Sequence, residues 1–258
     1  MNGESPFFYM LVLFLAAMLG AGIFFITRKQ ATQGIKLLLA FSAAYLLSLT
    51  LLHLFPELFE SGIEYAGWYV MGGFLLQVIL DFFSHGVEHG HAHTHHHVGT
   101  RFLFMVMVSL WIHAFIEGMP FGGEMAGHIH NHDHGAHDHA GLHDHRGSLL
   151  IGISLHKVTE TLVFAALLVN SGVKIGRALI WIVLFALVAP AGALFHHTMI
   201  DMDIHGIETL TPKVTGVLIG ILLHVSTTII FESEEGHKFN WMKFLAILIG
   251  IALAALVV

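Results

Sequence analysis

Eight apolar stretches, each long enough or nearly long enough to cross a bilayer, constrain this chain more than any other feature. A helix needs about 20 apolar residues to span the hydrocarbon core, and its backbone groups must be paired within the segment. The stretches run Pro6–Ile26, Gly34–Phe59, Tyr65–Phe83, Phe102–Gly122, Ser148–Asn170, Gly176–Thr198, Lys213–Phe231 and Trp241–Val258. The sequence therefore predicts an all-α polytopic membrane protein whose eight transmembrane helices form a single domain over residues 1–258.

The composition narrows the chemistry that such a bundle can perform. Of the 258 residues, 55% are hydrophobic and 11% are charged, whereas soluble domains carry about 25% charged residues. A large soluble core is therefore disfavoured, and no nucleic-acid partner is expected. The chain has no cysteine but 23 histidines, so any metal ion must be held by imidazole, carboxylate, Met, hydroxyl or water ligands.

The basic residues predict the orientation of the bundle. Cytoplasmic loops of membrane proteins carry an excess of Lys and Arg. Eight basic residues lie on one side of the predicted spans, namely Arg28, Lys29, Lys36, Arg101, Lys174, Arg177, Lys238 and Lys243, against Arg146 and Lys213 on the other. This bias places both termini outside, and it predicts a multi-pass protein of the cell (inner or plasma) membrane.

Two loops are rich in histidine. Residues 84–100 form a cytoplasmic loop by this topology, and residues 123–147 form an extracytoplasmic loop in which His alternates with Asp. Because neutral imidazole binds Zn, Cu, Fe and Ni, we expect weak, fast capture of metal ions by these loops; the alternative is a solvated linker. The candidate ligands are His91, His93, His95, His96 and His97 in the first loop and His130, His132, His134, His137 and His139 in the second.

Two His-x-x-x-Glu pairs lie inside apolar stretches. His113 and Glu117 are four residues apart in one predicted span, and His156 and Glu160 repeat the spacing in the next. Residues four apart share a helix face, and ionisable groups at membrane depth usually mark a functional site. A lone buried His is more often a hydrogen-bonded interior residue, but two facing pairs predict a four-ligand site for a divalent metal ion.

On these motifs the chain resembles the ZIP (Zrt/Irt-like) metal transporters along nearly its whole length. His113-Ala-Phe-Ile-Glu117-Gly118 is similar to the motif of that family's fourth span, and His156-Lys157 through Glu160 to that of its fifth. His53-Leu-Phe-Pro56-Glu57 and Ala189-Pro190-Ala-Gly192-Ala are similar to motifs of its second and sixth spans. The resemblance implies eight spans, outward termini and a metal site between spans four and five.

The departures from the family pattern bear on the number of metal ions. Many members hold a second ion, and the positions of its ligands match Ala114, Lys157 and Ala189 here. The resemblance therefore implies a mononuclear site of His113, Glu117, His156 and Glu160. We expect Lys157 to act as an internal counter-ion in place of the second metal, the alternative being a side chain that extends to the membrane interface. His53 and His224 are further candidates for residues that line the ion's path.

These features predict a transporter rather than an enzyme. The expected substrate is a divalent cation, zinc first and iron or manganese next, moved by alternating access. The resemblance to ZIP transporters implies transport toward the cytoplasm, and no resident cofactor is expected. The partners are metal ions and the lipid bilayer. A homodimer is compatible with the small size, although no span has a strong Gly-x-x-x-Gly face. The alternatives are an intramembrane zinc-dependent hydrolase and a metal sensor or receptor without transport.

Overall fold

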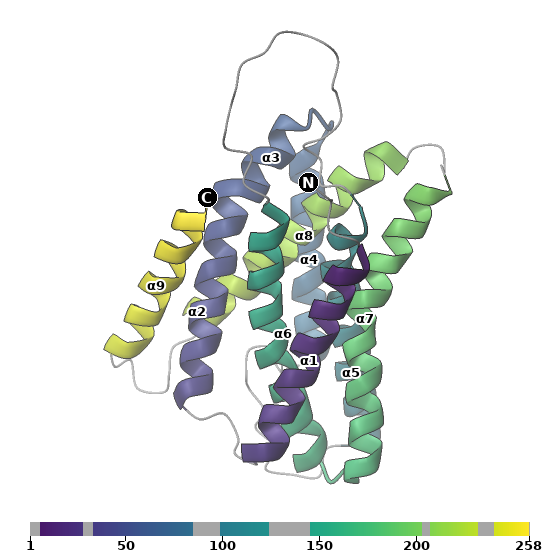
Figure 1. Ribbon diagram of the computed structural model, residues 1–258, viewed down its shortest axis with the longest axis vertical. Coiled ribbons are helices and arrows are strands. Elements are labelled where there is room, and N and C mark those ends of the chain that lie inside the picture. Colours follow the sequence, from purple (N-terminus) through teal and green to yellow (C-terminus); the bar gives the residue numbers. More distant parts are fainter. Residues whose placement is uncertain are drawn as a thin grey trace.

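The computed structural model describes residues 6–27, 33–84, 99–123, 145–202, 207–231 and 240–257. Within these ranges every regular element is a helix and none is a strand, and short turns connect some of the helices (Figure 1). The elements are α1 (Pro6–Thr27), α2 (Gln33–Leu49), η1 (Thr50–Leu54), α3 (Phe55–Glu60), α4 (Ala66–Ser84), α5 (Thr100–Gly118), η3 (Met119–Gly122), α6 (His145–Asn170), α7 (Ile175–Asp201), α8 (Ile207–Phe231) and α9 (Trp241–Val257).

Seven helical segments of the described chain are long and apolar enough to cross a membrane, so the protein is a multi-pass membrane protein. One of them is the continuous run of α2, η1 and α3, Gly34–Glu60. The bounds of these segments differ from the predicted spans by no more than three residues, except that α8 begins at Ile207, six residues before the predicted start at Lys213. The eighth predicted span is the apolar helix α9, which has 17 residues and rises about 25 Å. This length is close to the ~30 Å hydrocarbon core, and crossing by α9 stays a prediction.

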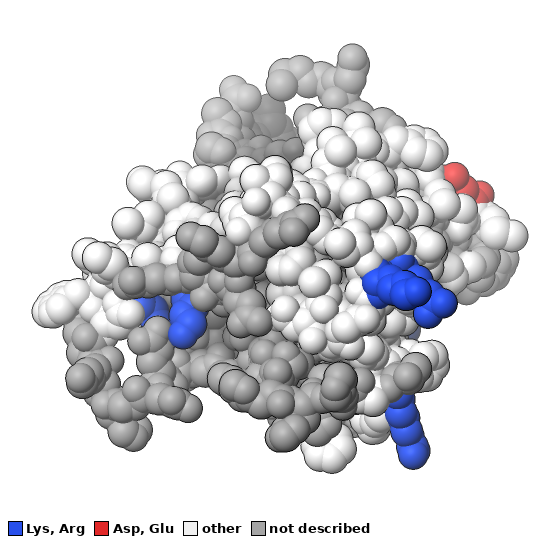
Figure 2. Space-filling model, turned by 90° about the horizontal axis from the view of Figure 1, so that it is seen from below, with Lys and Arg blue, Asp and Glu red and all other residues white. Residues whose placement is uncertain are grey.

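The two ends of the bundle differ in charge. The start of α1 and the end of α9 lie at the same end, at the top of Figure 1, as an even number of crossings requires. The opposite end, where α2, α5, α7 and α9 begin, shows basic side chains and little acidic surface (Figure 2). The basic residues in or beside the starts of these helices are Lys36, Arg101, Lys174, Arg177 and Lys243.

Glycines let neighbouring helices approach until their backbones touch. A methyl group at Gly118 of α5 would collide with the Ala189 carbonyl of α7, and one at Gly192 of α7 would collide with the Phe115 carbonyl of α5. Small residues at such crossings are typical of helix packing in lipid, where association depends on close van der Waals contact. The same arrangement joins α4 to α8 through Gly73 and Gly220, α1 to α6 through Gly20, and α9 to α2 through Gly250.

Separate apolar clusters hold different sets of helices together. One cluster joins α1, α5, α6 and α7, with Leu110, Phe164 and Phe185 among its members. Another joins α2 to α8 through residues such as Ala43 and Val225. Helices α5 and α6, which carry the two His-x-x-x-Glu pairs, therefore share one core.

Candidate metal centre

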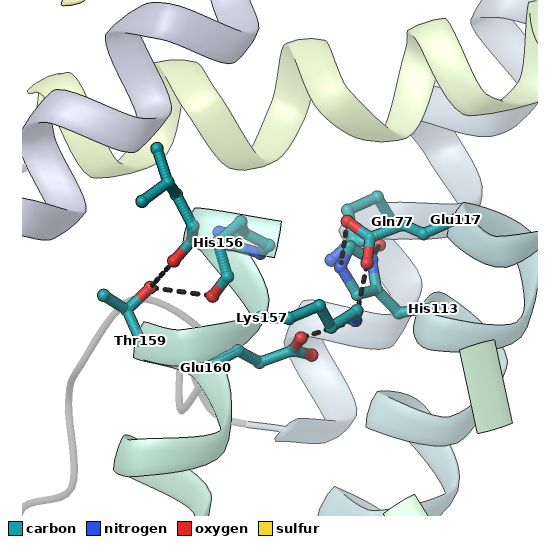
Figure 3. Close-up of polar contacts among 8 residues, drawn as sticks. Gln77, His113, Glu117, His156, Lys157, Thr159 and Glu160 are labelled. Atoms are coloured by element: carbon teal, nitrogen blue, oxygen red, sulfur yellow. Dashed lines mark hydrogen bonds and ion pairs between the residues drawn. The ribbon is translucent and has the colours of Figure 1, made fainter. Parts of the chain in front are cut away.

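The two His-x-x-x-Glu pairs face each other in the interior of the bundle. His113 and Glu117 come from α5, and His156 and Glu160 come from α6. All four side chains are at most 1% exposed, although they sit in helices whose outer faces carry large apolar residues. The helical spacing of four places each His one turn from its Glu. Figure 3 shows the side chains from the two helices pointing toward one another.

Three of these residues converge closely enough to share one metal ion. His113, His156 and Glu160 each offer a ligand atom, and these atoms all lie within 4.8 Å of one another. The two imidazole rings are 6.0 Å apart between centroids and inclined at 72°. Two imidazoles and a carboxylate suit zinc, and also iron and manganese. The protein therefore contains a buried His/His/Glu group that could hold a metal ion.

Glu117, the fourth expected ligand, lies beside this group and not within it. Its Oε1 is 3.0 Å from His113 Nε2, and its Oε2 is 2.6 Å from Lys157 Nζ. Both carboxylate oxygens thus already face a nitrogen of the site. Sequence spacing alone predicts four equivalent ligands, whereas the structure distinguishes a group of three from a neighbouring carboxylate.

Lys157 extends inward and bridges the two glutamates. Its Nζ lies 2.6 Å from Glu117 Oε2 and 2.5 Å from Glu160 Oε2, and its side chain is 2% exposed. The ammonium also lies 5.4 Å from the centre of the Phe185 ring, within cation–π range. With both histidines neutral, two carboxylates and one ammonium leave the cluster with a net charge of −1. Such a cluster attracts a divalent cation less strongly than two bare carboxylates would.

His156 is the residue of this cluster whose polar atoms are least satisfied. The ring is fully buried, and neither of its nitrogens has a hydrogen-bond partner among the described residues. The nearby Thr159 hydroxyl donates instead to the His156 backbone carbonyl, at 2.8 Å. Buried polar atoms are almost always paired, and leaving one unpaired costs about 1–3 kcal/mol. A metal ion on one ring nitrogen would remove part of this cost.

The contact between Gln77 of α4 and His113 was not predicted from the sequence. Gln77 is fully buried, and its amide Oε1 accepts a hydrogen bond from His113 Nδ1, at 3.0 Å (Figure 3). The signal in the sequence is weak, because a single Gln in an otherwise apolar helix does not reveal which residue it faces. With Nδ1 donating to Gln77, His113 keeps Nε2 for the site.

The other predicted residues are not members of the three-residue group. His53 is half-buried in η1, a π-helical turn in which the Phe55 N–H donates to the Thr50 carbonyl five residues back. The next residue, Pro56, has no N–H to continue the regular pattern. His224 is half-buried in α8, with its ring edge-on to Phe74 at 5.2 Å. All ten candidate loop histidines lie outside the described residues.

A third buried histidine was missed altogether. His196 of α7 is fully buried; its Nδ1 donates to the Met119 carbonyl at 2.7 Å, and its Nε2 accepts from the Thr211 hydroxyl at 3.2 Å. Both ring nitrogens are therefore satisfied by the protein. This residue joins η3, α7 and α8, and it has the geometry of a structural histidine.

Comparison with known proteins does not assign this chain to a family. No protein-family model matches the chain, and no curated protein matches it. The function must therefore be argued from the site itself and from the sequence motifs.

Proposed function

We propose that this protein is a carrier for divalent metal ions, zinc in the first place, and not an enzyme. The ion is its substrate, held in the interior of the bundle by His113, His156 and Glu160, with Glu117 beside them. The observation that carries the proposal is His156: its ring is fully buried among membrane-spanning helices, has no hydrogen-bond partner in the described chain, and lies beside two other potential ligands.

The charge of the site suits a carrier that must also release its ion. Conduction requires binding that is strong enough for entry and weak enough for exit. Two carboxylates with a net charge of −1 after pairing with Lys157 meet this requirement better than two free carboxylates. Protonation of the imidazoles and carboxylates competes with the metal, so acid should promote release.

Lys157 also explains why one ion is enough. Two facing carboxylates in a low-dielectric interior repel each other, and a second divalent ion would relieve that repulsion. The Lys157 ammonium contacts both Glu117 and Glu160 and would do the same within the chain. We therefore propose a mononuclear site with Lys157 in place of a second metal.

The sequence resemblance to ZIP transporters supports zinc and a direction of transport toward the cytoplasm. The basic residues at the end seen in Figure 2 support a cytoplasmic position for that end. In the proposed cycle, one group of helices moves against another around the site, so that the ion is reached first from outside and then from the cytoplasm. Next to the site α5 ends in the buried 3-10 turn Met119–Gly122, which contains Pro120.

A second candidate is an intramembrane zinc-dependent hydrolase. Three protein ligands with one open position are typical of catalytic zinc, and His113, His156 and Glu160 provide three. Glu117 adjoins them and could act as a general base for a zinc-bound water. Lys157 opposes this role, because its ammonium already pairs with Glu117 at 2.6 Å. Release of a fatty acid or amine from lipid amides by the purified protein would favour the hydrolase.

The carrier is tested by zinc uptake into proteoliposomes loaded with a fluorescent chelator. We expect uptake by the wild type, and none above protein-free vesicles for the double variant Glu117→Ala plus Glu160→Ala. Glu60→Ala is the matched control, since Glu60 is exposed at the end of α3 and its loss should leave uptake unchanged. Metal binding without uptake of zinc, iron or manganese would contradict the carrier and favour the hydrolase or a metal sensor.

A further inference from the structure

Gln77 connects the candidate metal centre to a helix that supplies none of its ligands. The ligands come from α5 and α6, which share an apolar cluster with α1 and α7. Gln77 belongs to α4, whose closest backbone approach is to α8 at Gly73 and Gly220. Its side chain is fully buried and reaches across to His113 Nδ1, at 3.0 Å.

We propose that Gln77 is a positioning residue of the metal site, a role that rests on the proposed binding of metal by His113. The amide oxygen accepts the Nδ1–H of His113, so the lone pair of the neutral ring is on Nε2. Nε2 lies 3.0 Å from Glu117 Oε1, and a cation bound at the site would relieve the repulsion between these two acceptor atoms. Gln77 thereby fixes both the orientation of the ring and the nitrogen that faces the ion.

The choice of an amide over a carboxylate has a consequence for transport. Metal-bound histidines usually donate their second N–H to a carboxylate or a carbonyl, and a carboxylate makes the ring a stronger ligand. A Glu at position 77 would also add a third negative charge near Glu117 and Glu160. The neutral amide of Gln77 orients His113 without either effect. Gln77 therefore allows the ion to bind in a defined geometry and still to be released.

Two substitutions separate the position of the ring from the strength of its binding. Gln77→Leu removes the acceptor at similar volume, and we expect Co²⁺ binding to weaken by about 10- to 100-fold, the usual effect of losing such a partner. Gln77→Glu keeps the acceptor and adds charge, so we expect tighter Co²⁺ binding together with slower zinc uptake. Ser84→Ala is the matched control, because Ser84 is a fully buried polar residue of α4 whose hydroxyl donates to the Asp81 carbonyl of the same helix.

The measurement is the visible absorption of Co²⁺ bound to the full-length protein in detergent. Each spectrum is taken as the difference from the same variant carrying His156→Ala, so that Co²⁺ bound at the histidine-rich loops cancels. A positioning role predicts that the saturated spectrum of Gln77→Leu differs from the wild type, and that Gln77→Glu restores a wild-type-like band. A role limited to helix packing would change the melting temperature and leave the saturated spectrum unaltered.

The outcomes distinguish this inference from the proposed function. If Gln77→Leu binds Co²⁺ with wild-type affinity and spectrum while the wild type takes up zinc, the positioning role is overturned and the carrier stands. If Gln77→Leu weakens binding and changes the spectrum while the wild type takes up no metal, the positioning role stands and the carrier is overturned. If the wild type shows no Co²⁺ spectrum that depends on His156, both are overturned.

Discussion

Two buried histidines in this protein have the same exposure and differ in their hydrogen bonding. His196, between η3, α7 and α8, has a bonded partner on each ring nitrogen, the Met119 carbonyl and the Thr211 hydroxyl. His156, between α5 and α6, has none among the described residues, and it lies beside two further ligand-type residues. Both rings are 0% exposed.

The comparison shows that burial of an ionisable side chain does not by itself mark a binding site. Buried polar groups are normally satisfied by the protein, as His196 is. A buried imidazole whose nitrogens remain unpaired is unfavourable unless something binds it. The completeness of hydrogen bonding therefore separates a structural histidine from a candidate ligand.

The largest effect is expected from Lys157, whose ammonium contacts both glutamates beside His156. Lys157→Met leaves Glu117 and Glu160 buried without a cation, and breaking a buried ion pair costs about 3–5 kcal/mol. We expect a lower melting temperature without metal, and a larger stabilisation on adding zinc than in the wild type. The measurement is thermal unfolding in detergent with and without zinc.

The control for this substitution is Lys174→Met, because Lys174 is exposed at the start of α7. This substitution should change neither the melting temperature without metal nor the stabilisation on adding zinc. The counter-ion role is wrong if Lys157→Met has wild-type stability and also binds zinc with unchanged stoichiometry and affinity.

A smaller but more specific effect is expected at His156. His156→Leu removes a ligand and two ring nitrogens that have no hydrogen-bond partner in the described part of the chain, so zinc binding should weaken by more than the ~100-fold upper range for outer-shell changes. Stability without metal should be equal to that of the wild type or higher, since an unpaired buried group has been replaced by an apolar one. Isothermal titration with zinc and thermal unfolding check the two parts. A strong loss of stability would place His156 in the same class as His196.

The smallest effect is expected at His196, and only on stability. His196→Leu leaves the Met119 carbonyl and the Thr211 hydroxyl without this partner, which should cost about 1–3 kcal/mol. The concentration of zinc that half-saturates uptake should stay within about twofold of the wild type. A large shift in that concentration would mean that His196 belongs to the ion's path, and the contrast with His156 would fail.

Sequence patterns predict the helices of this protein well because the bilayer restricts a spanning segment to one length and one structure. The predicted bounds of the first seven spans differ from those observed by three residues at most, apart from the start of α8, which lies six residues earlier than predicted. The π-helical turn at Thr50–Leu54 was not predicted, although Pro56 was a signal for a local break. Helix α9 falls short of the other spans in length, and its apolar composition alone could not show that.

The site was predictable where its members share a helix and less so where they do not. The spacing of four predicts which residues of α5 and α6 lie on one face, and it led to His113, His156 and Glu160. It could not rank Glu117 against the other three ligands, because that depends on how α5 and α6 are rotated toward each other. Gln77 and His196 were missed for a related reason. The partner of Gln77 is 36 residues away in the chain, and the two partners of His196 are 15 and 77 residues away. No short sequence motif connects residues at such separations.

The central claim is that one ion binds inside the membrane between α5 and α6, on His156, which has no hydrogen-bond partner among the described residues. The most direct measurement is anomalous diffraction at the zinc edge from crystals of the full-length protein grown with zinc. We predict one peak in the bundle, with His113, His156 and Glu160 ligand atoms about 2.0–2.2 Å from it and Lys157 still beside the carboxylates. Zinc peaks confined to positions outside the bundle, with the His156 ring hydrogen-bonded to the protein, would contradict the account.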